Sequence, residues 1–555
     1  MNALKKHKHA HIWGWIAKNT MRCIPAIILL TLLSIGISLI SLRFTAVSKS
    51  LMDIATGAQE GKLFYAIFRL IILMVLQLIV QVAITFLNVH ADAKMDIELK
   101  RNVFRTLIHK DYSAVSKYHS GELLNRLTSD LGIIVSGVIA MVPNVALILT
   151  NLIGGFLMLY RLDWMFALMI LSVGPLILIS SRLYSRRYKQ LHKDCQAAAG
   201  KVRSFMQETL QNLLVIKSFN SQNRVLDHNE TLQRKSYRLQ IKRTKISITA
   251  HILMYIAFNA GYYFALSYGA WKISKGLMTF GTVTAMLQLV GKIQTPFRDI
   301  SGLVPKALSI SASVERIQEL ENMPEESHSG IELDKDVYAA MDSIQFENVT
   351  FGYGEAMVME NVSFSISKGS FAVIAGESGA GKSTAIKLLL GIIHPHSGEI
   401  YLKTTDGRRL PLGSNSRALF AYVPQGSLIL SGSIRENICF ARTDATDEEI
   451  IHAAKIAQIW DFIETLDQGL DTMLGEKGLG LSEGQIQRLS IARALLYDAP
   501  ILLLDESTSA LDSATETAFL RAVKSLTDKT CIIVSHKKAA FDVCDQVIQI
   551  LPPNV

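Results

Sequence analysis

A glycine-rich stretch is the first part of the sequence whose residue types and spacing could do chemistry. Residues 376–384 read GESGAGKST and fit the pattern GxxxxGK[ST], between the apolar run FAVIA and a helical pattern. Lys382 would reach the outer phosphates of a nucleotide, and the Ser383 hydroxyl would bind Mg²⁺. Three glycines would let backbone N–H groups turn inward around phosphate oxygens: Gly376, Gly379 and Gly381.

Two acidic residues follow the fully apolar run ILLL in the sequence PILLLDES. Asp505 would hold Mg²⁺ through a water molecule, and Glu506 would orient or deprotonate an attacking water. For this pattern alone, an ordinary strand end with a helix cap is the alternative. Because a phosphate loop lies in the same chain, the two carboxylates predict hydrolysis of the bound nucleotide.

A helix start at residues 481–485, read LSEGQ, offers a second place for an anion. Ser482 supplies a hydroxyl, Gly484 supplies a bare backbone N–H group, and an apolar-periodic run follows. Backbone N–H groups at the start of a helix favour negative charge. The phosphate loop lies about a hundred residues upstream, so the residues alone leave open which phosphate LSEGQ would touch.

The elements that must position these residues differ between the two halves of the chain. Residues 342–555 alternate short β-branched runs, glycine-rich turns and helical patterns. Residues 305–341 are polar and acidic and indicate a linker, whereas residues 1–304 hold six long apolar stretches. A helix needs about 20 such residues to cross a bilayer. We therefore expect an α-helical six-span transmembrane domain, then an α/β P-loop nucleotide-binding domain.

The composition supports a membrane part joined to a soluble part. Hydrophobic residues make up 49% of the 555 residues and charged residues 19%, and the mean hydropathy is +0.27. A net charge of +9 would suggest nucleic acid binding in a soluble protein. Here the excess Lys and Arg lie beside apolar spans, so no nucleic acid partner is expected. The five cysteines are scattered and fit neither a disulfide framework nor a zinc site.

Charge on the loops predicts the orientation in the membrane. The gaps after the first, third and fifth spans are short, whereas those after the second and fourth are long, basic and helical in pattern. Lys and Arg on such loops place them in the cytoplasm together with the N-terminus. No small-residue cleavage site follows the first apolar run, so we interpret it as a retained span. The spanning helices should continue well into the cytosol.

Taken in order, the motifs resemble the nucleotide-binding domain of the ATP-binding cassette (ABC) family. Tyr353 in VTFGYGEA matches the aromatic residue that stacks on adenine, and Gln425 in YVPQ matches the glutamine that meets both Mg²⁺ and the membrane domain. LSEGQ matches the family signature, and His536 matches the switch histidine at the γ-phosphate. SALD at 509–512 matches the loop that crosses between two cassettes, and GEKG at 475–478 resembles a segment found mainly in exporters.

This resemblance implies ATP and Mg²⁺ as cofactors and assigns the residues of the site. Glu506 and His536 would be catalytic, and Ser383, Gln425 and Asp505 would hold the metal. The nucleotide would be bound by Tyr353, Gly376, Gly379, Gly381, Lys382, Ser383, Thr384, Gln425, Ser482, Gly484, Gln485 and Asp505.

The resemblance also implies which phosphate LSEGQ touches. In such cassettes two copies stack head to tail around ATP. Ser482 and Gly484 of one copy would then contact the γ-phosphate held by Lys382 of the other. One cassette per chain makes this a half-transporter that needs a second half-transporter chain. We expect a homodimer, with a heterodimer as the alternative. Glu483 replaces the usual glycine of the signature, and its carboxylate must point away from the phosphates.

The first half resembles the six-helix membrane domain of ABC exporters. HSGELLNRLTSD and ETLQNLLVIKSF look like the family's coupling segments, which would dock in cassette grooves near Gln425. We therefore expect an ATP-driven transporter in the lipid bilayer of a bacterial inner membrane, with its N-terminus and nucleotide-binding domain in the cytoplasm. It would export amphipathic small molecules, lipids or peptides. Too few residues precede the first span for a leader-cleaving peptidase domain.

The transported substrate is not set by the sequence. Lys292 and Arg69 in the spans could attract an anionic group, with snorkelling or helix–helix hydrogen bonding as the alternative. Other polar residues in the spans are Gln77, Gln81, Asn144, Asn151, His251, Asn259 and Gln288. Other functions stay open: an exporter-shaped importer of metal chelates, a soluble ABC ATPase acting on nucleic acid or ribosomes, and an ATP-gated channel. The apolar spans argue against the soluble ATPase, and no sequence feature favours the channel.

Overall fold

Two units make up the chain, and each has its own internal contacts. The structure is a computed structural model that describes residues 12–326, 333–354, 356–377, 379–426, 429–475, 480–526 and 528–552. One unit comprises residues 1–106 and 120–322, and the other comprises residues 107–119 and 323–555. In the described residues the first unit is helical, and the second holds the strands.

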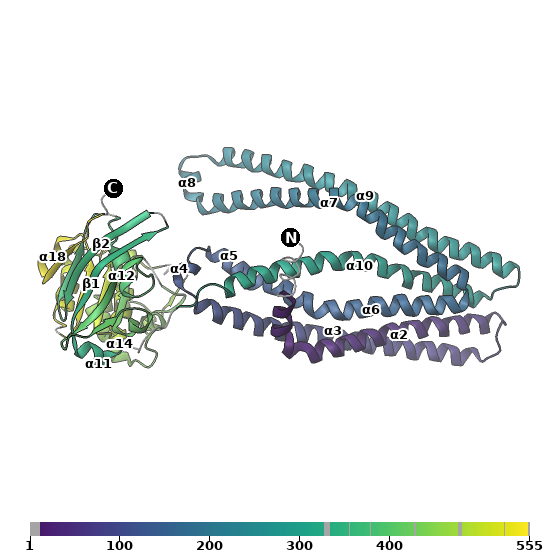
Figure 1. Cartoon of the computed structure of the whole chain (residues 1–555), viewed down its shortest axis with the longest axis horizontal. Helices are drawn as coiled ribbons and strands as arrows, with labels where there is room; N and C mark the ends of the chain where they lie inside the picture. Colours follow the sequence, from purple (N-terminus) through teal and green to yellow (C-terminus); the bar gives the residue numbers. More distant parts are fainter. Residues whose placement is uncertain are drawn as a thin grey trace. The chain divides into compact units, whose positions relative to one another are not determined.

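Six long helices form the described part of the first unit (Figure 1). They are α2 (Ile24–Ala55), α3 (Leu63–Ile108), α6 (Leu131–Leu162), α7 (Trp164–Gln211), α9 (Gln222–Ser274) and α10 (Phe280–Glu321). The helices α2, α6 and α10 pack together, and α7 packs along α9. The short helix α8 (Leu213–Ser218) lies between α7 and α9 in the chain. The predicted helical fold class is confirmed.

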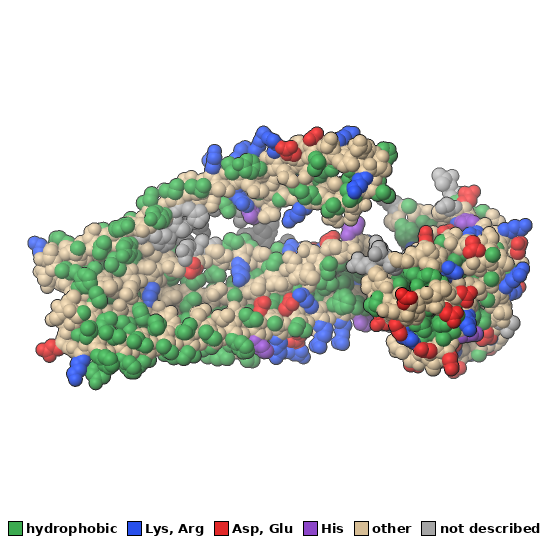
Figure 2. Space-filling model, turned by 180° about the vertical axis from the view of Figure 1, so that it is seen from behind, with side chains coloured by type: hydrophobic (Ala, Val, Ile, Leu, Met, Phe, Trp, Pro, Cys, Tyr) green, Lys and Arg blue, Asp and Glu red, His purple; other side chains and the backbone are tan. Residues whose placement is uncertain are grey.

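Apolar side chains cover much of the outside of these helices. By length and composition, three described stretches could cross a membrane: Ile12–Ala55, Leu63–Ile108 and Ser120–Leu162. Along α3, large apolar side chains such as Phe64, Leu78 and Phe86 are exposed. Figure 2 shows hydrophobic side chains gathered over the end of the unit that holds the α2–α3 turn. An outward apolar surface of this kind suits a helix surrounded by lipid.

Several helices run much further than a bilayer requires. The helices α7 and α9 have 48 and 53 residues, about 70–80 Å at 1.5 Å per residue against a hydrocarbon core of about 30 Å. The expected continuation beyond the spans is therefore confirmed. The helix α10 includes Pro296 and Pro305 and continues to Glu321, so the segment predicted as a linker begins as helix. The domain boundaries at residues 304 and 341 stay a prediction.

The second unit is built on a five-stranded parallel sheet with the order β11-β3-β10-β9-β6. Its strands are β3 (Phe371–Ala375), β6 (Phe420–Val423), β9 (Ile501–Asp505), β10 (Thr530–Val534) and β11 (Gln546–Gln549). Val373 and Leu504 both pair with Ile533. These three side chains face one apolar core, and the alternate residues of the same strands face a second core. Burial on both faces explains why these strands read as continuous apolar runs.

An antiparallel sheet with the order β2-β1-β4-β5 packs its apolar side chains into the second of these cores. Its strands are β1 (Met341–Tyr353), β2 (Ala356–Ser367), β4 (Ser397–Thr404) and β5 (Arg409–Pro411), and a small separate pair is β7 (Gly432–Ser433) with β8 (Met473–Leu474). The helices are α11 (Lys335–Ala339), α12 (Lys382–Leu389), α13 (Ile434–Ile438), α14 (Asp447–Ile456), α15 (Trp460–Glu464), α16 (Glu483–Tyr497), α17 (Ser513–Lys524) and α18 (Lys538–Val543). The predicted α/β fold class is confirmed.

Residues 107–119 also belong to this second unit and include the short helix α4 (Tyr112–Val115). The Asp111 N–H donates to the Pro324 carbonyl at 3.0 Å, and the Glu326 N–H donates to the His109 carbonyl at 3.1 Å. A cavity of about 650 Å³ lies between this segment and the rest of the second unit, with Tyr112 and Tyr422 in its lining. The sequence predicts docking from His119 onward. Residues 126–130 pack on α10 within the first unit, whereas residues 107–119 pack within the second unit, so docking of the segment as a whole stays a prediction.

Candidate functional site

The phosphate loop connects β3 to α12, in the strand–loop–helix context that the sequence predicts. Gly376, Gly379 and Gly381 have φ values of 155°, 85° and 94°, a range that L side chains rarely adopt. A Cβ atom on Gly376 would lie 2.4 Å from the Ile550 carbonyl oxygen. Glycine is therefore required at this position by both backbone conformation and close approach.

Lys382 is the first residue of α12 and is buried. Its Nζ donates to the carbonyl of Gly376 at 2.9 Å and to that of Glu377 at 2.8 Å. The ammonium group is thus held by the mouth of the loop itself. Phosphate oxygens are stronger partners for an ammonium group than neutral carbonyls are, so this side chain is suited to exchange its contacts when a nucleotide binds. Thr384 is buried in the first turn of the helix.

Asp505 ends β9 and joins the strand to the phosphate loop. The Ser383 hydroxyl donates to its Oδ1 at 2.8 Å, and the Tyr422 hydroxyl lies 3.4 Å from its Oδ2. Burial raises the pKa of Asp505, the Ser383 hydrogen bond opposes this shift, and the nearby charge of Glu506 adds to it. A hydroxyl and a carboxylate side by side are the oxygen ligands that Mg²⁺ prefers. The residues present therefore fit the expected metal.

Glu506 is held from two sides just beyond the same strand. Its φ is 47°, an uncommon value for a residue with a side chain, and its N–H donates to the Val534 carbonyl at 3.1 Å. The Gln425 Nε2 donates to its Oε2 at 2.6 Å, and the His536 Nε2 lies 3.6 Å from its Oε1. Residues that follow β6, β9 and β10 therefore meet at the carboxyl edge of the parallel sheet, where α/β folds place ligands.

Tyr353 lies at the exposed end of β1, next to the hairpin that leads into β2. Its ring packs edge-on against Phe351 with centroids 5.0 Å apart, and about half of the residue is exposed. A Cβ atom on Gly381 would lie 2.9 Å from Val358 of β2, so this hairpin lies directly against the phosphate loop. The aromatic face is thus available beside the loop, as a base-stacking residue requires.

The LSEGQ segment forms the capped start of α16. Ser482 is the N-cap, with its Oγ accepting from the Gln485 N–H at 3.3 Å while the Gln485 Oε1 accepts from the Ser482 N–H at 2.8 Å. Glu483 is exposed in the first turn, where the helix dipole favours a negative charge. Among the contacts of the described residues, none joins Ser482 or Gln485 to Lys382 or Ser383 of the same chain.

Gln487 is a functional candidate that the sequence prediction missed. Its Nε2 donates to the Ser509 hydroxyl at 2.9 Å, and its Oε1 accepts from the Ala510 N–H at 3.0 Å. A Cβ atom on Gly484 would lie 2.9 Å from the Ala510 carbonyl oxygen. The start of α16 is therefore packed tightly on the SALD loop. A glutamine two residues after LSEGQ was the available signal.

Tyr422 was also missed, although it lies three residues before Gln425. Burial and the nearby Asp505 raise the pKa of Tyr422, so its hydroxyl stays protonated and can donate. Another predicted feature lies mostly outside the described residues. Of GEKG, only Gly475 lies within the described residues. No cluster of three His, Cys, Asp or Glu side chains that could hold a metal occurs within the described part of the chain.

In the helical unit, Lys292 points from α10 to α2. Its Nζ donates to the Ser41 hydroxyl at 2.7 Å and to the Ser41 carbonyl. Two neighbouring contacts continue this polar line: Gln288 donates to Ser48 at 3.3 Å, and Ser38 donates to Asn151 at 2.8 Å. Arg69 is exposed on α3, whereas the His251 side chain lies outside the described residues. Whether Lys292 or Arg69 touches a substrate stays a prediction.

Comparisons with known proteins agree with this geometry. Two family models match the chain, "ABC transporter transmembrane region" over residues 27–297 and "ABC transporter" over residues 359–509. An ATP-dependent lipid A-core flippase of Alcanivorax borkumensis is 30% identical over 457 residues, which cover 81% of this chain and 77% of that protein. ABC transporter B family member 1 of Dictyostelium discoideum is 28% identical over 490 residues, which cover 87% of this chain and only 53% of that longer protein.

The fold also matches a solved structure along almost its whole length. A bacterial Atm1-family ABC exporter with ATP bound superposes with a TM-score of 0.79. The match covers 96% of this chain and 95% of that chain at 23% sequence identity. At this identity the likeness shows a shared fold.

Proposed function

This chain belongs to the ABC transporter family and is an ATP-hydrolysing integral membrane transporter, and we propose that it works as a homodimer that exports lipids or similar amphipathic molecules. One observation carries the catalytic part of the proposal. Gln425, Asp505, Glu506 and His536 meet at one edge of the parallel sheet, and Ser383 joins them to the phosphate loop. The same chain continues into helices with outward apolar surfaces.

In the proposed reaction, Glu506 acts as the general base. Gln425 donates to one carboxylate oxygen and His536 approaches the other, so the carboxylate is oriented before the nucleotide arrives. Lys382 binds the outer phosphates and Glu506 accepts a proton from the attacking water. Mg²⁺ held by Ser383 and Asp505 would neutralise charge on the transferring phosphate group.

The second chain completes the site in this proposal. The capped start of α16 has its N–H groups and the Ser482 hydroxyl at an exposed helix end, which is suited to a phosphate. Because no contact in the described residues joins it to the phosphate loop of its own chain, we assign it to the nucleotide of a second copy. A different half-transporter chain as partner is the alternative.

The orientation and the compartment belong to the proposal as well. The long basic loops after the second and fourth spans support a cytoplasmic N-terminus and a cytoplasmic cassette. The relative from Alcanivorax borkumensis is named as a lipid A-core flippase, which supports a lipid substrate here, and we propose a bacterial inner membrane as the compartment. An importer of metal chelates is the alternative, because the fold of the helical unit does not by itself set the direction of transport.

The test uses the purified protein in proteoliposomes with the cassettes facing outward. ATP should move a fluorescent phospholipid or lipid A from the outer leaflet to the inner leaflet, and either lipid should raise ATP hydrolysis. The Glu506→Gln protein is the control, and it should show neither effect. Uptake into the vesicle of a metal chelate without lipid movement leaves ATP-driven transport in place but removes the lipid substrate. Movement of a chelate out of the vesicle, toward the cassettes, supports the importer.

A further inference from the structure

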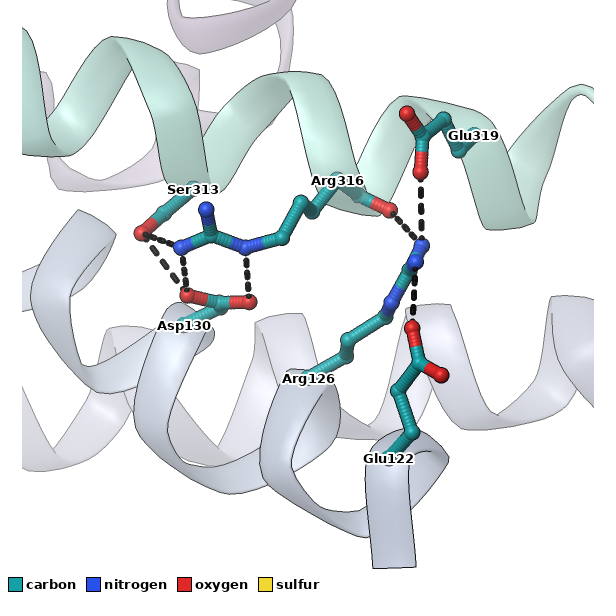
Figure 3. Close-up of polar contacts among 6 residues, drawn as sticks. All are labelled: Glu122, Arg126, Asp130, Ser313, Arg316 and Glu319. Carbon is teal, nitrogen blue, oxygen red and sulfur yellow. Dashed lines mark hydrogen bonds and ion pairs between the residues drawn. The ribbon is translucent and has the colours of Figure 1, made fainter. Parts of the chain in front are cut away.

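A polar cluster with a buried centre lies between the helical run that leads into α6 and the end of α10, and none of its members belongs to the nucleotide site (Figure 3). On one side the residues recur every fourth position along α5 (Ser120–Asn125) and the π turn η2 (Arg126–Asp130), and on the other side every third position along α10. Such spacing places each row on one helix face. We call the cluster the α6–α10 clamp: Glu122, Arg126, Asp130, Ser313, Arg316 and Glu319.

Asp130 is the centre of one half of the clamp. Arg316 donates two parallel hydrogen bonds to its carboxylate, from Nε to Oδ2 at 2.7 Å and from Nη2 to Oδ1. The Ser313 hydroxyl donates to Oδ1 at 2.9 Å. A paired arrangement of guanidinium and carboxylate restricts geometry as well as charge. These contacts therefore fix the register of α10 against the start of α6.

Arg126 is the centre of the other half. Its Nη1 donates to the Arg316 carbonyl at 2.8 Å and to Glu319 Oε2 at 3.0 Å. Its Nη2 donates to Glu122 Oε1 at 2.8 Å. One guanidinium thus holds a carboxylate of its own helix, a carboxylate of α10 and the α10 backbone. Figure 3 shows the two halves side by side along the interface.

The centre of the clamp is buried, whereas Glu122, Arg316 and Glu319 at its margin are partly exposed. Asp130 is 2% exposed, Arg126 is 6% exposed and Ser313 is fully buried. A buried charge that loses its partner is strongly unfavourable, because neither water nor protein then compensates it. Separation or sliding of the two helices would leave the charges of Arg126 and Asp130, both in the run that leads into α6, without their partners on α10. The two helices are therefore expected to move together.

Apolar packing next to the clamp also opposes separation of α6 and α10. A Cβ atom on Gly137 of α6 would lie 2.4 Å from Ile310 of α10, so the helices approach closely there. Leu131, Ile134 and Ile317 belong to the same buried core. The π turn at residues 126–130 interrupts the regular helix at this point, and π turns within helices often occur at functional positions.

The position of the clamp in the chain suggests its role. The chain passes between the two units three times, and two of these passages adjoin the clamp: α5 begins directly after residues 107–119, and α10 ends just before residue 323. Within the second unit the same two passages are paired, since Asp111 donates to Pro324 and Glu326 donates to His109. The two passages are thus joined twice, by the clamp in the first unit and by these backbone hydrogen bonds in the second unit.

We propose that the α6–α10 clamp joins these two passages into one rigid connection, so that cassette movement on ATP binding reaches α6 and α10 together. This inference rests on the proposed ATP-driven transport cycle. The members of the clamp are positioning residues, because they lie in the first unit and none is among the residues assigned to the nucleotide site. Loss of the clamp should leave ATP chemistry intact and reduce its coupling to the membrane helices.

The first test separates coupling from catalysis. Asp130→Asn keeps the size of the side chain and removes its charge. Basal ATP hydrolysis and ATP trapping should stay within about twofold of wild type, while lipid-stimulated hydrolysis should fall about tenfold, within the usual range of coupling between two sites. A double variant that swaps the two charges, Asp130→Arg with Arg316→Asp in one chain, should recover part of the lost lipid-stimulated hydrolysis. Glu230→Gln is the control, since it breaks an exposed pair with Arg234 on α9.

The second test does not depend on the transported substrate. Spin labels replace the exposed side chains Leu124 and Leu308 on one protomer, in a chain whose own cysteines have been replaced. With ATP trapped by Glu506→Gln, the distance between the labels should match that of the nucleotide-free protein. Asp130→Asn should broaden or lengthen it.

The possible outcomes show separately whether the clamp proposal or the proposed lipid export is wrong. With the clamp residues unchanged, a label-to-label distance that differs between the ATP-trapped and nucleotide-free protein would overturn the proposal. An Asp130→Asn protein with the same distance and the same lipid-stimulated hydrolysis as wild type would overturn it as well. If no lipid stimulates the wild-type protein, lipid export fails and the distances still decide about the clamp. If Asp130→Asn yields no folded protein, Arg316→Lys takes its place, because lysine keeps the charge and loses the parallel hydrogen bonds.

Discussion

Glu506 occupies a backbone conformation that costs free energy, and its neighbours keep it there. Its φ of 47° lies in the left-handed region, and strain of this kind persists only when the surroundings fix it. The fixing contacts are the Val534 carbonyl, the Gln425 amide and the His536 ring. This arrangement directs the carboxylate away from β9 and toward residues that follow two neighbouring strands. At the scale of a single residue, these contacts orient the carboxylate, as the proposed role of Glu506 as general base requires.

Glu506→Gln should remove hydrolysis and leave ATP binding in place. The amide keeps the shape of the side chain but cannot accept the proton, and loss of a general base costs about 10²–10⁴ in turnover. Steady-state phosphate release measures the loss, and retention of labelled ATP after rapid desalting measures binding. Turnover close to that of wild type would assign the base to a different residue.

Tyr422→Phe should reduce turnover without preventing folding. The change removes only the hydroxyl that lies 3.4 Å from Asp505 Oδ2. A hydrogen bond of this kind contributes about 1 kcal/mol, which corresponds to about fivefold in kcat/KM for Mg·ATP. The matched control is Tyr401→Phe, because the Tyr401 hydroxyl donates to Glu347 at 3.0 Å in the antiparallel sheet. Equal kinetics for the two variants would exclude a role for Tyr422 at Asp505.

Sequence motifs predict the individual residues of this site better than they predict which side chains those residues contact. The approach of Ser383 to Asp505 could be predicted, because the phosphate loop and the acidic strand end both follow parallel strands. The contacts of Gln487 with the SALD loop and of Tyr422 with Asp505 could not be predicted from spacing. Both depend on side-chain direction at the edge of the sheet, which sequence periodicity does not specify.

At the scale of elements, the junction of α2 with the start of α10 depends on one glycine. Asp53 of α2 is buried and accepts from the Gly281 N–H at 3.0 Å and from Lys49 at 2.9 Å. A Cβ atom on Gly281 would lie 2.3 Å from the Lys49 carbonyl oxygen and 2.5 Å from Asp53 Oδ1. The close approach of the two helices therefore requires glycine at this position.

Gly281→Ala should destabilise the helical unit by about 1–3 kcal/mol, the usual cost of inserting a methyl group where there is no room. Gly291→Ala is the matched control on the same helix, because a Cβ atom there meets nothing within 4 Å. Thermal unfolding of the detergent-solubilised protein should show a lower midpoint for Gly281→Ala alone. A common midpoint for the two variants would show that α2 and α10 do not meet as described.

The extent of the helices could be predicted only in part. Apolar stretches and basic helical gaps predict six long helices and their continuation, as observed for α7 and α9. The continuation of α10 to Glu321 could not be predicted, because residues 305–321 contain a proline and many polar side chains. In the structure Ile310, Val314 and Ile317 are buried, and the clamp pairs the charges. Tertiary contacts therefore override the local pattern.

At the scale of the whole molecule, the proposed nucleotide site needs a second chain, which would supply LSEGQ. The phosphate loop, the acidic strand end, Gln425 and His536 come together within the chain. The capped start of α16 contacts the SALD loop, and its contacts in the described residues include none to Lys382. The order of motifs predicts both the cassette and the membrane half. A head-to-tail arrangement of two cassettes belongs to an assembly of two chains, so a single chain cannot show it.

Mixed dimers test whether Ser482 serves the nucleotide of the second chain. In the split arrangement, one chain carries Lys382→Ala and the other carries Ser482→Ala. If Ser482 acts across the dimer, both changes fall in the same composite site and the other site stays intact. In the combined arrangement, one chain carries both changes and its partner is wild type at both positions, so each composite site has one defect.

The readout is nucleotide trapping, with Glu506→Gln on both chains, because the two sites could hydrolyse ATP only together. Loss of a charge-assisted phosphate contact costs roughly 1.5–3 kcal/mol, enough to weaken a site tenfold or more. The split dimer should therefore retain about one tightly held ATP, and the combined dimer close to none. If Ser482 instead serves its own chain, the ranking reverses, because the wild-type partner then keeps an intact site. That result would assign LSEGQ to the phosphate held by Lys382 of the same chain and would remove the need for a second copy.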